Sequence, residues 1–215
     1  IGIVPNLDAI NLDTLSIGLE KGFIKTNEYM ETTQPGIYAI GDVTAPPWLA
    51  HKASHEAVLC AERIAQQCGK YNGHLKPIQR GMIPACTYSY PQVASIGLTE
   101  AAAKAEASKL GRGEVKLRIG RFPLAANEKA LAMCEDEGFV KVIFDDETGE
   151  LLGAHMVGAE VTELIQGFSI AKRAELTEAE LLHAIFPHPT VSEAMHEAVL
   201  DAWQGALHII SAPKK

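Results

Sequence analysis

The chain has 215 residues, of which 47% are hydrophobic and 21% charged; these values are typical of a globular protein with one or two domains and exclude disordered and fibrous classes. The formal net charge of -8 argues against a nucleic-acid binder, because such a protein needs an excess of Lys and Arg to neutralise phosphates. No apolar run approaches the roughly 18 to 20 residues that span a bilayer, so we expect a soluble protein with no membrane contact.

The cysteines indicate a reducing compartment. Cys60, Cys68, Cys86 and Cys134 lie far apart, without the short spacings of a disulphide framework or a zinc knuckle. The sequence opens on IGIVPNLDAI, an apolar strand end that runs directly into a turn without a Met. We therefore expect a fragment whose upstream part is absent.

The first 70 residues predict short strands and turns followed by one helix. Residues 21–27 alternate weakly between apolar and polar side chains, and residues 36–42 (GIYAIGD) form an almost continuous apolar run that is typical of a parallel strand buried on both faces. Residues 51–68 have the helical spacing of apolar side chains, and Gly69 ends this predicted helix.

Asn, Gly and Pro cluster over residues 72–84, and we place a domain boundary there. Beyond it, residues 85–90, 92–98 and 114–122 predict strands, residues 99–110 a polar surface helix, and residues 138–158 a hairpin about an Asp/Thr/Gly turn. Three further helices are predicted over residues 160–174, 177–186 and 190–210. Strands followed by helices favour an α+β domain with helices on one face of an antiparallel sheet.

His188 stands between Pro187 and Pro189, and the two prolines leave its extended segment little backbone freedom. Thr190 and Glu193 form the T-x-x-E pattern of a capping box, which predicts that Thr190 is the N-cap of the last helix. A carboxylate within reach of the ring fixes one nitrogen and leaves the other free to exchange a proton, as a general acid or base requires. The spacing alone equally permits a structural histidine beside a capping glutamate.

The stretch FPHPTVSEAMHEAVLDA (residues 186–202) resembles the C-terminal segment of the pyridine nucleotide-disulphide oxidoreductases, and most closely that of members that oxidise dihydrolipoamide. In that family the histidine exchanges a proton with the active-site thiols and the glutamate orients it. The resemblance implies that His188 and Glu193 are the catalytic pair. It also implies a homodimer in which the histidine serves the flavin and the disulphide of the opposite subunit.

A second stretch, TTQPGIYAIGDVTAPPWLAHKASHEA (residues 32–57), resembles the second flavin segment of the same family. A glycine lets the backbone approach a cofactor and an aspartate accepts hydrogen bonds from sugar-like hydroxyls, so Gly41 and Asp42 are implied FAD ligands. The PWLAHKA step that follows implies further flavin contacts. These come from Trp48, which stands in place of the usual methionine, and from Leu49, Ala50 and His51.

The opening GIVPN resembles the turn that ends the NAD domain of the family, with Ile3 where arginine is common. This match implies that Gly2 lies near the NAD cofactor. A simple exit from a strand into a turn explains the same residues.

The resemblance covers essentially the whole chain and divides it into three parts. Residues 1–22 would be the end of the NAD-binding domain, 23–76 the last segment of the FAD-binding domain, and 77–215 the dimerisation domain. FAD and NAD are the implied cofactors. The sequence contains neither the Gly-rich FAD-binding segment nor the C-x4-C redox disulphide of the family, so we expect these residues alone to be inactive.

The implied partners are a second copy of the chain and the lipoyl domains of 2-oxo acid dehydrogenase complexes or of the glycine cleavage system, in a bacterial cytoplasm or a mitochondrial matrix. Two alternatives stay open: a non-catalytic homodimerisation module, and a glutathione-type disulphide reductase. No metal site is expected, because neither His51 with His55 nor His196 with Glu197 has a third ligand at a usable spacing.

Overall fold

A computed structural model describes residues 2–109, 116–203 and 205–210 of the chain. It divides into two compact units, residues 1–80 (unit 1) and 81–215 (unit 2), and each is described by itself. The assignment of residues 1–22, 23–76 and 77–215 to three parts of a larger flavoprotein stays a prediction. The predicted strand at 114–122 and the predicted helix at 99–110 each include end residues outside the described ranges. The helix predicted at 190–210 was too long at both ends, because the observed helix spans Glu193–Trp203 and residues 205–210 are not helical.

Unit 1 is built around one long helix, α1 (Ala50–Gln67), which confirms the helix predicted at 51–68. Leu59 and Cys60 are buried on its inner face and pack in one cluster with Met30 and Leu75. The helix ends where predicted, because Gly69 has a φ of +69°, a left-handed conformation that glycine adopts without a steric penalty. The carboxyl end of α1 is thus fixed by local sequence.

The strand predicted at residues 36–42 was wrong. Within unit 1 the described strands are β1 (Leu19–Glu20) and β2 (Phe23–Ile24), which pair antiparallel, and Tyr38 forms only an isolated antiparallel bridge with Glu31. The run is extended, and the Ala39 N–H donates to the Met30 carbonyl, but no parallel neighbour is present among the described residues. An apolar run without a partner strand cannot form a ladder.

Unit 2 contains a five-stranded antiparallel sheet in the order β3-β4-β7-β6-β5. The predicted strands and hairpin are confirmed, with somewhat shorter limits. The strands are β3 (Ala85–Thr87), β4 (Gln92–Gly97), β5 (Leu117–Pro123), β6 (Phe139–Asp145) and β7 (Leu151–Gly158). Because β6 and β7 form the predicted hairpin at the middle of the sheet, the two strands with the strongest apolar pattern are also the most enclosed.

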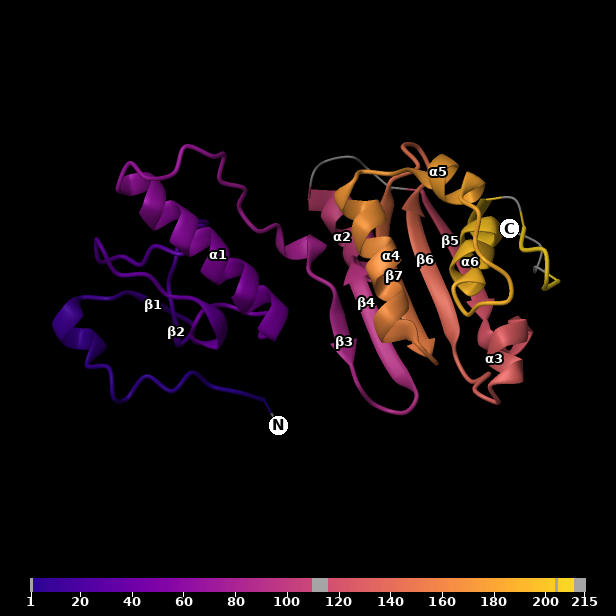
Figure 1. The fold of residues 1–215 in the computed structure, drawn as a ribbon, viewed down its shortest axis with the longest axis horizontal. Coiled ribbons are helices and arrows are strands. Elements are labelled where there is room, and N and C mark those ends of the chain that lie inside the picture. Colours follow the sequence, from indigo (N-terminus) through magenta and orange to yellow (C-terminus); the bar gives the residue numbers. More distant parts are fainter. Residues whose placement is uncertain (1, 110–115, 204, 211–215) are drawn as a thin grey trace. The chain divides into compact units, whose positions relative to one another are not determined.

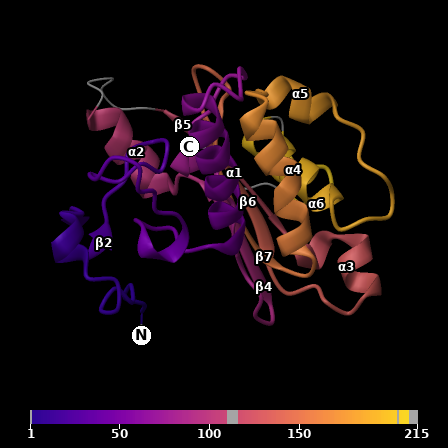
Figure 2. The ribbon, with the colours of Figure 1, turned by 60° about the vertical axis from the view of Figure 1, so that its left-hand side comes forward.

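Two helices, α4 (Val161–Arg173) and α6 (Glu193–Trp203), cover one face of this sheet (Figures 1 and 2). Along β6 the side chains of Val140, Val142 and Phe144 point to this face and are fully buried, as period-2 alternation requires. Burial of each such side chain stabilises the unit by roughly 1.5–3 kcal/mol. α6 approaches β5 so closely that a Cβ at Gly120 would stand 1.8 Å from the Ala198 carbonyl oxygen.

The remaining helices of unit 2 are α2 (Glu100–Lys109), α3 (Glu128–Ala132) and α5 (Glu178–His183). α2 and α5 fall within predicted helices, whereas α3 was not predicted. Its N-cap is Asn127, whose side-chain oxygen accepts the Ala130 N–H at 2.9 Å. An N-capped helix of five residues therefore precedes β6.

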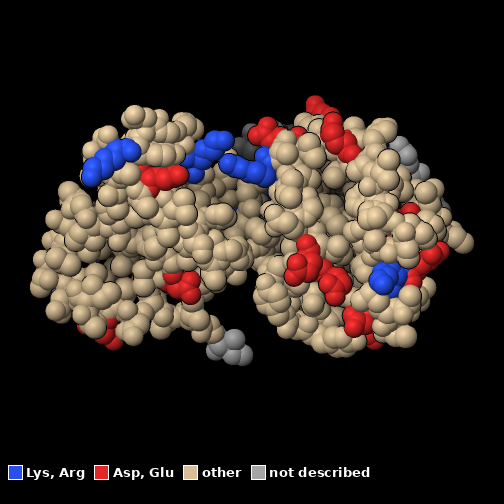
Figure 3. Space-filling model, viewed as in Figure 1, with Lys and Arg blue, Asp and Glu red and all other residues tan. Residues whose placement is uncertain are grey.

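None of the helices in the described parts of the chain combines the length and the hydrophobicity that a membrane crossing requires. On the face of unit 2 shown in Figure 3, acidic side chains predominate over basic ones. This agrees with the formal net charge of -8.

Candidate functional site

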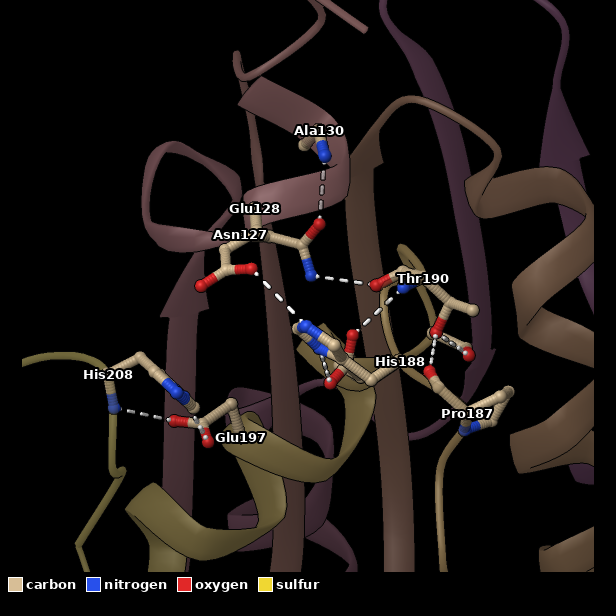
Figure 4. Close-up of polar contacts among 10 residues, drawn as sticks. Asn127, Glu128, Ala130, Pro187, His188, Thr190, Glu197 and His208 are labelled. Carbon is tan, nitrogen blue, oxygen red and sulfur yellow. Dashed lines mark hydrogen bonds and ion pairs between the residues drawn. The ribbon is translucent and has the colours of Figure 1, made fainter. Parts of the chain in front are cut away.

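His188 lies in the segment that connects α5 to α6 (Figure 4). Its side chain is 61% exposed, and the His188–Pro189 peptide bond is cis. The Nδ1 atom lies 3.0 Å from Oε1 of Glu193, the first residue of α6. The structure thus brings together the two side chains that the sequence singled out.

Glu193 uses its two carboxylate oxygens for different partners. Oε1 contacts the His188 ring, and Oε2 accepts the Thr190 backbone N–H at 2.9 Å, one of the two hydrogen bonds of a capping box. The prediction that Thr190 is the N-cap was wrong, because α6 begins only at Glu193 and no capping box is formed at its described start. The Thr190 hydroxyl donates to the Pro187 carbonyl at 2.7 Å. The carboxylate is therefore anchored to the backbone while it holds the ring.

The pair favours its charged form. The hydrogen bond and the charge of Glu193 raise the pKa of His188 above its ordinary value, while partial desolvation opposes the shift and Glu128 adds to it. Burial acts to raise the pKa of Glu193, but the Thr190 N–H and the His188 ring outweigh it and lower that pKa. With Nδ1 donating to a carboxylate, the neutral ring presents a free lone pair at Nε2.

A second carboxylate, which the sequence reasoning missed, lies at the other nitrogen. Oε2 of Glu128, the first residue of α3, is 3.4 Å from Nε2 of His188 (Figure 4). Asn127 ties α3 to the histidine segment, because its Nδ2 donates to the Thr190 carbonyl at 3.0 Å. The Asn-Glu pair is a helix-start signal in the sequence, but nothing in it indicates proximity to His188.

One turn beyond Glu193, α6 carries a second carboxylate–imidazole pair. Glu197 is buried, and its Oε1 lies 3.0 Å from Nδ1 of His208 (Figure 4). Its Oε2 accepts the backbone N–H groups of Leu207 and His208 at 2.9 and 3.2 Å. Glu197 thus fastens the segment that follows α6.

The predicted flavin residues of unit 1 lie around a tight turn, η2 (Gly41–Val43). Gly41 is buried with a φ of +74°, and its N–H donates to Oε2 of Glu56 at 2.8 Å. Asp42 is exposed beside it. The turn therefore exposes the Asp42 carboxylate to solvent, while the hydrogen bond between Gly41 and Glu56 holds its backbone.

A buried ion pair holds this turn. Lys52 and Glu56, one turn apart on α1, are 2.9 Å apart with side chains only 4% and 6% exposed. Lys52 also donates to the Thr44 hydroxyl at 3.2 Å, and that hydroxyl donates to the Gly41 carbonyl at 2.7 Å. The sequence reasoning missed both residues, because a Lys-Glu pair at this spacing is most often a solvated surface pair.

The other predicted flavin residues lead from the turn into α1. The Trp48 indole donates to the Thr44 carbonyl at 3.2 Å and stacks on Phe23 with ring centroids 5.1 Å apart. Leu49 is the N-cap of α1, and Ala50 and His51 are its first, exposed residues. At the position of the usual methionine, this chain therefore has an indole that contacts Thr44 and Phe23.

Gly2 is exposed with a φ of +137°, and no described atom lies within 4 Å of where its Cβ would stand. A side chain at this position would thus meet open space. Within the described ranges, no group of three or more His, Cys, Asp or Glu side chains is arranged to hold a metal ion. His196 instead contacts the Leu182 carbonyl through Nε2 at 3.0 Å and stacks on Phe186.

Comparisons with known proteins agree with this architecture. The chain is 56% identical over 208 residues to a dihydrolipoyl dehydrogenase of Rhizobium etli and 51% identical to one of Zymomonas mobilis; each match covers 97% of this chain but only 41% and 42% of the relative. The chain thus spans about two fifths of the length of these relatives. A crystal structure of LpdA from Mycobacterium tuberculosis superposes with a TM-score of 0.77 at 27% identity, over 93% of this chain and 41% of that one.

Two family models match the sequence. The pyridine nucleotide-disulphide oxidoreductase model matches residues 1–57, and the dimerisation-domain model of the same family matches residues 83–199. The second match contains the sheet of unit 2, α3, and the His188–Glu193 pair, and it confirms the resemblance drawn from residues 186–202. The chain therefore belongs to the pyridine nucleotide-disulphide oxidoreductase family.

Proposed function

We propose that the chain works as part of a dihydrolipoyl dehydrogenase, which oxidises protein-bound dihydrolipoamide to lipoamide and reduces NAD+ to NADH. The observation that carries the proposal is the His188–Glu193 pair at 3.0 Å, within a chain that is 56% identical to a curated relative of that name. A histidine whose one nitrogen is held by a carboxylate and whose other nitrogen is exposed is equipped to move a proton.

In this proposal, His188 is the base that accepts a proton from a substrate or active-site thiol. Glu193 holds the Nδ1 proton, so the Nε2 lone pair points away from α6 and is the atom that accepts the thiol proton. Loss of that proton makes the sulphur a thiolate, which is the nucleophilic form. Glu193 stabilises the resulting imidazolium, in accord with the raised pKa of His188.

The residues of unit 1 fit a flavin cofactor. Asp42 is an exposed carboxylate on a turn fixed by the Glu56–Gly41 hydrogen bond, and such a group can accept hydrogen bonds from the ribityl hydroxyls of FAD. Leu49, the N-cap of α1, and Ala50 and His51, its first two residues, would supply further contacts. Bound FAD would supply electron transfer between the thiols and NAD+.

We assign Gly2, which is exposed and has open space beside its Cα, to the part of the protein that binds NAD.

The protein would act as a homodimer through the domain at residues 83–199, with His188 serving the opposite subunit. Its other partners would be the lipoyl domains of 2-oxo acid dehydrogenase complexes or of the glycine cleavage system. Four cysteines without a disulphide suit a bacterial cytoplasm or a mitochondrial matrix.

The test is His188→Gln in the flavin-loaded enzyme that contains this chain. Without the base, turnover of dihydrolipoamide with NAD+ should fall by about 10²- to 10⁴-fold while flavin content stays unchanged. His183→Gln is the matched control, because His183 is an exposed histidine of α5 whose Nδ1 contacts a backbone carbonyl. Normal turnover by His188→Gln would refute the role, and preferential use of glutathione over dihydrolipoamide would refute the substrate.

A further inference from the structure

The proposed reaction must release a proton. Oxidation of one dithiol by one NAD+ gives one disulphide, one NADH and one H+, so the proton that His188 accepts has to leave the ring in every turnover. Nδ1 is occupied by Glu193 at 3.0 Å. Nε2 is therefore the nitrogen through which the proton both arrives and leaves.

Among the described residues, the carboxylates within ion-pair distance of this ring are Glu193 at Nδ1 and Glu128 at Nε2. Glu193 cannot carry a proton away without giving up its structural bonds: its oxygens are engaged by the ring and by the Thr190 N–H, and its side chain is only 27% exposed. Glu128 is 68% exposed and lies 3.4 Å from Nε2. It thus contacts both the reacting nitrogen and solvent.

Asn127 fixes the position of the helix that carries Glu128. α3 begins at Glu128 because Asn127 caps it, and the same Asn127 side chain donates to the Thr190 carbonyl, two residues after His188. One buried amide therefore fixes the helix that carries Glu128 against the segment that carries the ring. The Glu128 side chain itself is 68% exposed, so it can rotate between the His188 ring and water. A group that carries a proton from the ring to water needs this freedom.

We propose that Glu128 is a further catalytic residue, the carboxylate that takes the proton from Nε2 of His188 and passes it to solvent. In this step the Nε2–H bond breaks, an O–H bond forms at Glu128, and the carboxyl then releases the proton to water; no electrons are transferred. The inference rests on the proposed function, because it needs His188 to be the base.

The test is Glu128→Gln in the flavin-loaded enzyme, which keeps the shape of the side chain and removes its basicity. In weakly buffered solution kcat should fall by roughly three- to tenfold, a part of the effect of a full general base. Added imidazole or formate should restore it, because a small buffer can take the proton from Nε2. Glu137→Gln removes the same charge from an exposed position before β6 and should leave kcat unchanged at every buffer concentration.

A second readout is independent of turnover. In Glu128→Gln the pKa of His188, followed by NMR of its ring protons, should fall, because a negative charge beside the imidazolium is lost. A kcat equal to that of the unmodified enzyme, or a loss that no buffer restores, would overturn the role of Glu128. If His188→Gln itself left turnover normal, the proposed function would fail first, so the two failures are distinguishable.

Discussion

Replacement of Lys52 by Met tests the buried ion pair beneath the Asp42 turn. The substitution keeps the length of the side chain and removes its charge, which leaves the Glu56 carboxylate, 6% exposed, with the Gly41 N–H but without the ammonium group 2.9 Å away. Removal of one partner of a buried pair costs about 3–5 kcal/mol, because the remaining charge stays desolvated. We expect this loss in the free energy of unfolding of unit 1.

The measurement is urea unfolding followed by fluorescence. The chain has two tryptophans, one in each unit, so Trp203→Phe leaves Trp48 as the reporter for unit 1. Trp48 donates to the Thr44 carbonyl and therefore senses the turn directly. The variants of Lys52 and Glu56 are all compared in this background.

The double variant Lys52→Met/Glu56→Met separates charge from packing. It removes both ions, so the remaining loss should be only the roughly 1–3 kcal/mol of an unsatisfied Gly41 N–H. It should therefore be more stable than Lys52→Met alone. A single variant that loses less than about 1 kcal/mol, or a double variant less stable than the single one, would refute the reasoning.

Further predictions concern unit 2. Glu193→Gln should lower the pKa of His188, so that NMR titration of its ring and the acid limb of kcat/KM, which requires the neutral ring, both move to lower pH. Gly120→Ala should destabilise unit 2 by about 3 kcal/mol in urea unfolding followed by Trp203, because its Cβ meets the backbone of α6. Glu197→Ala should speed amide hydrogen exchange at His208 by about tenfold, because that N–H loses its acceptor; unchanged exchange would contradict this.

The elements that were predicted correctly are those whose signals are local. α1, α4 and the β6–β7 hairpin follow from spacing of apolar side chains within one segment, and their ends follow from turn residues such as Gly69. The His188–Glu193 contact was likewise predictable, because the two residues are close in sequence and belong to one helix start. At this helix start, the sequence pattern and the observed contact involve the same two residues.

What the sequence could not predict depends on contacts between distant segments. The apolar run at 36–42 is the same whether or not a parallel neighbour is beside it, so its pattern predicted a strand that did not form. Lys52 and Glu56 look like a surface pair until the Gly41 turn folds over them. Glu128 reaches His188 only because Asn127 joins α3 to the segment before α6.

Because these contacts form only in the folded protein, the protonation of the His188 ring depends on the folding of unit 2. In the unfolded chain neither Glu128 nor the anchored Glu193 is held at His188, so the pKa of the ring returns toward its ordinary value. Folding therefore takes up protons at pH values between the unfolded and the raised folded pKa. The contribution of this site to stability is complete below the unfolded pKa and is lost as the pH rises through the folded one. The titration of this exposed histidine thus reports chiefly whether the start of α6, which carries Glu193, has formed, and Glu128 of α3 adds to the shift.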